Sequence, residues 1–123
     1  MMNCNEIEQI IQEKGKIAPR ITPDDIEANI TNEYYFTALD GICGNEESTD
    51  VDVAYAPDST RLLTFCVIVL RNGFTVTGES ACASPENFDA ELGRKIARNN
   101  AVNKIWPLMG YELRSKLSAK DGE

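Results

Sequence analysis

The sequence predicts an α+β fold in which a small antiparallel sheet is packed by helices from both ends of the chain. The strongest signal is LLTFCVIVL (62–70), which is short, apolar and rich in β-branched residues. Asn72-Gly73 follows as a turn signal, and FTVTG (74–78) alternates apolar residues with Thr, so the two runs form a hairpin. Helical patterns flank the hairpin on both sides, and a length of 123 residues fits a single domain, 1–123.

Two helices are predicted before the hairpin. CNEIEQIIQEK (4–14) places three isoleucines at helical spacing, and Gly15 follows as a stop. TPDD (22–25) combines an N-cap hydroxyl, a proline at the first helical position and two acids at the positive end of the helix dipole, which predicts a helix from about 23 to 32. EYYFTAL (33–39) then fits either a continued helix or the start of a strand.

The middle of the chain is acidic. Residues 40–60 mix glycine, acids, Ser and Thr with little periodicity, which predicts a mobile acidic loop with one short strand around Val51 to Tyr55. The run 62–70 is apolar almost throughout, as in a strand covered on both faces or nearly so. Asn72-Gly73 is expected to form a type I′ turn with positive φ at both residues.

A long helix is predicted after the hairpin. Ser84 is a candidate N-cap before Pro85, and the helix is expected to run from Phe88 to about 106, where Pro107 breaks or kinks it before a shorter final helix. The expected core stripe of the long helix is Phe88, Leu92, Ile96, Val102 and Trp106.

Four polar residues of this helix fall on two sides of it. Asn99 and Asn103 lie on the side of the stripe, where each needs a partner, and Arg94 and Arg98 lie opposite, one turn apart. An alternative for the arginines is an ordinary solvated face. Gly93 inside the helix indicates a close approach by a backbone, a partner chain or a ligand, or simple tolerance.

Composition excludes several function classes. The chain has no histidine, which removes Ser-His and Cys-His nucleophile pairs and imidazole metal ligands. Its four widely spaced cysteines form no zinc pattern and are expected to be free thiols, with Cys66 a small buried hydrophobe. The sequence therefore predicts a binding protein, with no catalytic residues, cofactor or metal.

Charge and hydropathy limit the partners. Residues 1–60 hold 13 acidic and 3 basic side chains and residues 61–123 hold 7 and 9, within a net charge of -8. Such a chain disfavours DNA or RNA as a partner, whereas a few arginines can still hold a small anion. No apolar run approaches a membrane span and the first residues lack a secretory signal, so we expect a cytoplasmic protein with no membrane partner.

The chain resembles a family of small early proteins of tailed phages that has no assigned function and includes podophage-type members. The resemblance covers about residues 22–118. It rests on the order of TPDDIEANITNEYYFTA, LTFC, NGFTVTGESAC, NFD, LGRKIA and AVNKIWPL, with LGRKIA in place of the family's IGRKIA-type segment. The first 20 residues and the stretch 40–60 carry no diagnostic motif.

The same pattern resembles the first type of phage Thoeris anti-defence protein. This second resemblance implies a non-catalytic sponge for a cyclic ADP-ribose isomer made by bacterial TIR-domain sensors, or for cyclic oligonucleotides of the CBASS pathway. It also implies a homo-oligomer, a dimer or higher, with ligands at subunit boundaries. An infected or lysogenic bacterial cell is the implied setting.

Ligand chemistry then selects candidate binding residues. A cyclic nucleotide requires guanidinium groups for its phosphates, an aromatic face for its base and amides for base edges or ribose hydroxyls. The residues available for these roles are Arg94, Arg98, Asn72, Phe74 and Asn99.

Two other function classes stay open. A phage protein that inhibits a host enzyme or defence protein could use the acidic stretch EESTDVD (46–52) to mimic nucleic-acid phosphates. A metal-dependent phosphodiesterase would need clustered carboxylates, and the acids here gather in a loop without metal-ligand spacing.

Overall fold

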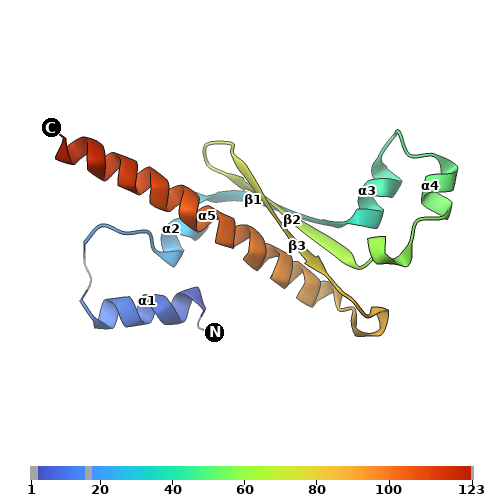
Figure 1. The fold of residues 1–123 in the computed structure, drawn as a ribbon, viewed down its shortest axis with the longest axis horizontal. Coiled ribbons are helices and arrows are strands. Elements are labelled where there is room, and N and C mark those ends of the chain that lie inside the picture. Colours follow the sequence, from blue (N-terminus) through green and yellow to red (C-terminus); the bar gives the residue numbers. More distant parts are fainter. Residues whose placement is uncertain (1–2, 16–17, 123) are drawn as a thin grey trace.

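The predicted hairpin forms two strands of a three-stranded antiparallel sheet of order β1-β2-β3 (Figure 1). The computed structural model describes residues 3–15 and 18–122. Its elements are α1 Cys4–Glu13, α2 Pro23–Asn29, β1 Ile30–Thr37, α3 Ala38–Gly44, α4 Asp50–Ala54, β2 Leu63–Leu70, β3 Thr75–Ala81 and α5 Ala90–Asp121, with 3-10 turns at Asp58–Thr60 and Pro85–Asn87. The α+β fold predicted from the sequence is confirmed.

The core lies between one face of the sheet and α5, which runs along that face in Figure 1. Alternate residues of β2 are buried on this face, among them Cys66 and Ile68 with no exposed surface. Ile26 of α2 completes the cluster from the side. Burial of Cys66 raises the pKa of its thiol and agrees with its expected role as a small hydrophobe.

Backbone contact between α5 and β3 decides which residues of α5 face the sheet. A Cβ placed on Gly78 would collide with the Ala97 carbonyl oxygen and the Ala101 amide nitrogen, and one placed on Gly93 would lie 3.3 Å from Thr64 Oγ1. Only small side chains fit at such a distance. Gly93, Ala97 and Ala101 therefore face the sheet where the two backbones are closest, and Val102 and Ile105 complete the buried side of α5.

The stripe predicted from the sequence is wrong over its first half. Leu92 and Ile96 are 53% and 43% exposed, and Phe88 lies before α5, which Asp89 caps. Asn99 and Asn103 are exposed as well, so they need no buried partner. The error arises because α5 has a stripe of large apolar residues next to a stripe of small ones. The helical period of 3.6 residues does not show which of the two stripes packs on the sheet.

The helix also continues through Pro107 to Asp121, so the alternative of a break there, followed by a separate shorter helix, is wrong. Proline removes the amide that would bond to the carbonyl of Asn103. Both residues are exposed, so water can satisfy that carbonyl.

Segments before β2 correct two further expectations and decide one open alternative. The helix predicted over 23–32 ends at Asn29, because the β-branched and aromatic residues that follow pair with β2. EYYFTAL accordingly belongs mainly to β1. The strand predicted around Val51 to Tyr55 is instead the short helix α4, which begins with a capping box of Thr49 and Asp52.

The hairpin turn is of a different type from the one predicted. Gly73 has φ +87°, as expected, but Asn72 has a negative φ. The Gly73 amide donates to the Leu70 carbonyl and Leu70 pairs with Phe74, which is the three-residue loop with a left-handed glycine. Asn72 serves the turn through its side chain, which accepts a hydrogen bond of 2.9 Å from the Phe74 amide.

The second face of the sheet is less covered than the face that packs on α5. Residues of β2 alternate between buried positions on the α5 side and half-buried positions on the other side. The helices that share the core, α2 and α5, lie on the same side of the sheet. Because α2 and α5 form a single layer on one side of the sheet, the apolar side chains on the other side of β2 stay partly exposed to solvent.

Gly78→Ala should destabilise the protein by at least about 3 kcal/mol, because the methyl group meets backbone atoms of α5 that cannot move aside. Gly110→Ala is the matched control. A Cβ at Gly110 meets nothing within 4 Å, so this change inside α5 should stabilise by up to about 1 kcal/mol. Urea unfolding measures both values. Equal stability of the Gly78→Ala variant and the wild type would contradict the close approach of α5 to β3.

Candidate ligand-binding hollow

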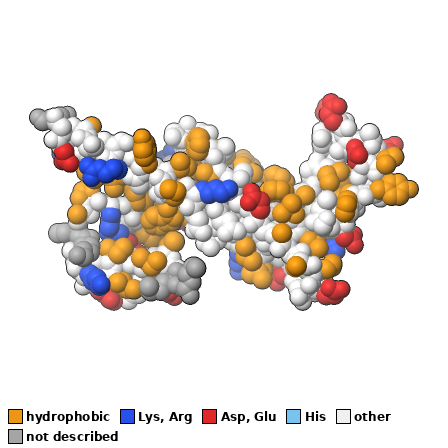
Figure 2. Space-filling model, viewed as in Figure 1, with side chains coloured by type: hydrophobic (Ala, Val, Ile, Leu, Met, Phe, Trp, Pro, Cys, Tyr) orange, Lys and Arg blue, Asp and Glu red, His pale blue; other side chains and the backbone are white. Residues whose placement is uncertain are grey.

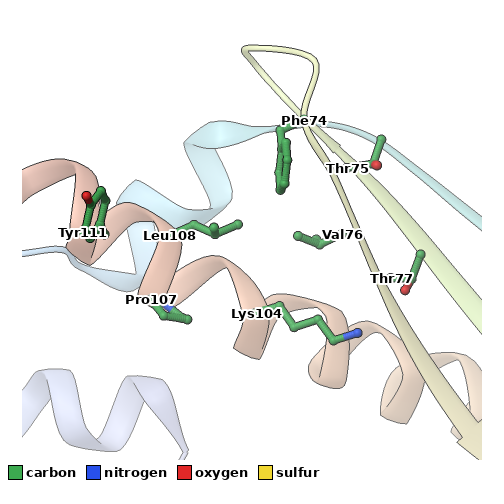
Figure 3. A pocket seen from close by; sticks show the side chains of 8 residues that line it. All are labelled: Phe74, Thr75, Val76, Thr77, Lys104, Pro107, Leu108 and Tyr111. Atoms are coloured by element: carbon green, nitrogen blue, oxygen red, sulfur yellow. The ribbon is translucent and has the colours of Figure 1, made fainter.

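A hollow of about 480 Å³ opens where α5 passes the beginning of β3. Figure 3 shows Phe74 extending from the start of β3 toward Leu108, with Tyr111 one turn further along α5. Val76 and Pro107 add apolar surface. The hollow thus offers two aromatic side chains, 56% and 78% exposed, above an apolar floor, which is the arrangement that a flat heteroaromatic ring can stack on.

One wall of the hollow is the free edge of the sheet. The Glu79 carbonyl points outward from β3 and accepts a hydrogen bond of 2.8 Å from Asn100 Nδ2 of α5. Backbone groups alternate in direction along a strand, so the groups of Thr75 and Thr77 point outward as well, into the hollow. They can bond to polar edges of a ligand, as edge strands do with added peptides.

Lys104 supplies the positive charge of the hollow. Its side chain extends along α5 toward Thr77 (Figure 3). Among the described residues Lys104 has no ion-pair partner, whereas Lys95 and Lys116 of the same helix are paired with Glu91 and Glu112. Lys104 is therefore available to a phosphate group.

Arg98, predicted to bind a ligand, is occupied by protein groups. Its guanidinium contacts Glu27 of α2 at 2.8 Å and Glu33 of β1 at 2.7 Å, and Nε donates to Glu33 at 2.8 Å. Tyr35 donates its hydroxyl to the second oxygen of Glu33. This cluster ties α5 to both elements, and it raises the pKa of Arg98 and lowers the pKa of Glu33 by hydrogen bonding to the charged forms.

The structure does not bring the five predicted residues together. Arg94 lines a small hollow with Phe88 and Asp40 near the start of α5. Asn99 lines another hollow with Arg98, beneath α2. Asn72 lines a third, next to Arg71, and Phe74 alone belongs to the hollow described above.

Sequence reasoning missed Lys104 and Tyr111, which line the same hollow as Phe74. They are seven residues apart, with Leu108 between them, and so share one side of a continuous helix. The expectation that Pro107 breaks the helix concealed this spacing. A pattern search that allowed an exposed proline would have placed all three on one side.

Residues 3–15 and 18–122 provide neither a metal site nor a membrane-spanning helix. These residues contain no group of three or more Cys, Asp or Glu side chains able to hold a metal ion. None of their helices is long and apolar enough to cross a membrane. Their four cysteines are unpaired, as predicted.

This geometry defines the chain as a small α+β protein with an open hollow that is lined by aromatic side chains and a lysine. The model of the Phage protein (N4 Gp49/phage Sf6 gene 66) family matches residues 21–117, and the chain belongs to that family. The phage family expected from the sequence is thereby confirmed. No curated protein and no solved structure matches the chain.

Glu33→Gln should destabilise the protein by roughly 1 to 3 kcal/mol at pH 7, since it removes the charge that faces Arg98. Because folding lowers the pKa of Glu33, its contribution is present above the ordinary value of 4.5 and is lost as the pH falls through the lower value of the folded protein. The stability difference between variant and wild type should therefore shrink from pH 7 to pH 3.

Glu27→Gln is the control for this measurement by urea unfolding. Glu27 is twice as exposed as Glu33 in the same cluster, so its loss should cost less. A Glu33→Gln variant that matches the wild type at pH 7 would show that the cluster contributes nothing to folding.

Proposed function

We propose that this phage protein is a non-catalytic anti-defence protein that binds and sequesters a cyclic nucleotide immune signal. The ligand class is a cyclic ADP-ribose isomer or a cyclic oligonucleotide, and the protein acts in the cytoplasm of the infected bacterium. The observation that carries the proposal is the hollow of Phe74, Tyr111 and Lys104.

Each group of the hollow has a role in this proposal. Phe74 and Tyr111 stack on the base, and stacking contributes about 1 to 3 kcal/mol per base. Lys104 binds a phosphate oxygen as a point charge. The outward backbone groups of Thr75 and Thr77 bond to the base edge or a ribose hydroxyl. Sequestration requires only such binding groups, which suits a chain without histidine.

The direct test is uptake. The purified protein is incubated with cyclic ADP-ribose isomers and, separately, with cyclic oligonucleotides, then heat-denatured, and the released compounds are identified by mass spectrometry. Intact ligand supports sequestration. Fragments would indicate an enzyme, and no uptake would contradict the proposal.

Phe74→Ala and Lys104→Met should each weaken binding about tenfold or more by calorimetry, because each removes a contact of about 1.5 kcal/mol or more. Both residues are exposed, so folding should change by less than about 0.5 kcal/mol. Lys95→Met, on the same helix outside the hollow, is the control and should bind as the wild type. If Phe74→Ala and Lys104→Met bind with the affinity of the wild type, the site lies elsewhere, and exposed Arg94 is the next candidate.

A second candidate function has one observation in its favour. Figure 2 shows acidic side chains beside hydrophobic ones at the end of the molecule that carries α3 and α4. Val51, Val53 and Tyr55 are exposed there, next to Asp50 and Asp52. A surface of this kind suits a protein partner with basic and apolar groups, as expected for an inhibitor of a host enzyme or defence protein.

Two variants distinguish the candidates when phage growth is measured on a host that carries the defence system. Loss of protection in Val51→Ser, Tyr55→Ser, with ligand uptake intact, would favour the inhibitor. Loss of protection in Phe74→Ala, with α4 unchanged, would favour sequestration.

A further inference from the structure

We infer that a second hollow, which lies between α1, α2 and α5, binds a neutral sugar, that is, a ring that carries several hydroxyl groups and no charge. This α2 hollow has a volume of about 450 Å³ and is lined by the start of α1, by α2 and by the middle of α5 (Figure 1). Its size falls within the roughly 300 to 1,000 Å³ of small-molecule sites. It shares no residue with the hollow of Phe74, Tyr111 and Lys104, so the inference goes beyond the proposed function.

Amides and carboxylates make up most of the polar lining of the α2 hollow. Among residues 3–15 and 18–122, the side chains of Asn5, Asp24 and Asn99 have no hydrogen-bond or ion-pair partner. An amide donates and accepts hydrogen bonds, and a carboxylate accepts several. The α2 hollow therefore offers both donors and acceptors to a ligand. Its polar lining residues are Asn3, Asn5, Asp24, Glu27, Arg98 and Asn99.

The charges that line the α2 hollow disfavour an anion. Asp24 has no cationic partner among the described residues, and the guanidinium of Arg98 already contacts Glu27 and Glu33. A phosphate or carboxylate group would thus meet an unpaired carboxylate and an arginine that is held by two others. A ligand without negative charge fits this lining better.

The indole of Trp106 favours a ligand that can accept a hydrogen bond. Trp106 lines the α2 hollow, and its Nε1 atom is buried without an acceptor in the described part of the chain. Buried donors without a partner cost free energy and are rare. An ammonium group has no acceptor for this N–H, whereas a hydroxyl group both donates and accepts. Because α1 has no buried residue, the wall that it forms can shift to let a hydroxyl reach Nε1.

The apolar part of the α2 hollow suits the C–H face of a sugar ring. Ile26 and Val102 are buried, and the partly buried ring of Trp106 packs against the same cluster. The C–H face of a sugar would cover these side chains, while the hydroxyls on its rim would bond to Asp24 and Asn99. A neutral sugar is thus the ligand class that meets the requirements of both the polar and the apolar lining.

The test is a titration of the full chain with glucose, ribose and N-acetylglucosamine, followed by the NMR signal of the indole N–H. Trp106 is the single tryptophan of the chain, so this signal reports on the α2 hollow. We expect at least one of these sugars to shift the signal saturably. The expected Kd is millimolar, because a monosaccharide has few atoms. Phosphate and methylammonium should give no saturable shift, and a saturable shift with either ion but with none of the sugars would overturn the inference.

Two variants test the proposed contacts. Asn99→Ala should weaken sugar binding about three- to tenfold and Asp24→Ala about tenfold or more, because each removes a hydrogen-bond partner and the second removes a charged one. Both residues are exposed, so folding should be little affected. Asn103→Ala is the matched control and should bind as the wild type, because it makes the same change one turn further along α5, outside the α2 hollow.

Three other outcomes would overturn the inference. The first is the absence of a saturable shift with all three sugars up to about 100 mM. The second is wild-type affinity in both Asn99→Ala and Asp24→Ala. The third is loss of sugar binding in Phe74→Ala, because the sugar would then bind in the other hollow. The titration uses no nucleotide, so its failure and the failure of the proposed function are distinguishable.

Discussion

Contact between the backbones of α5 and β3 is the constraint on which the rest of the structure depends. Gly78 has no room for a Cβ, and Ala97 and Ala101 present the smallest side chains that a helix of this kind can carry. A 32-residue helix is about 48 Å long, whereas an eight-residue strand spans about 26 Å. The helix therefore crosses the sheet and continues beyond it, and the candidate hollow lies where it leaves β3.

The ion pairs of Arg98 hold this helix in place across the sheet. Glu33 on β1 and Glu27 on α2 reach the same guanidinium, so one side chain connects three elements. A partly buried arginine with two carboxylate partners has little left to offer a phosphate. Lys104 supplies the positive charge available to a ligand in the described hollow. Salt screens charges over about 8 Å, so the distant acidic residues do not cancel the local attraction of this lysine for an anion.

The two faces and the outer edge of the sheet have different surroundings. The α5 side of β2 forms the core, the outer edge of β3 borders the hollow, and the opposite side of the sheet is apolar and open to solvent. The acidic segment from α3 to α4 extends from one end of the sheet in Figure 1, away from the hollow. The hollow and the acidic segment are thus separate surfaces, so a ligand and a protein partner would not compete for the same residues.

Local sequence determined the hairpin, helix α1, the capped start of α2 and the presence of a long C-terminal helix, because hydrophobic period, caps and glycine act within a few residues of chain. The tertiary structure decided which side of α5 faces the sheet, since the closest packing selects Gly93, Ala97 and Ala101 over the larger Leu92 and Ile96. It also decided that Arg98 pairs with Glu33, 65 residues away, and that Lys104 and Tyr111 line the same hollow as Phe74. Contacts between residues so far apart depend on how the elements pack, which no local pattern of side chains contains.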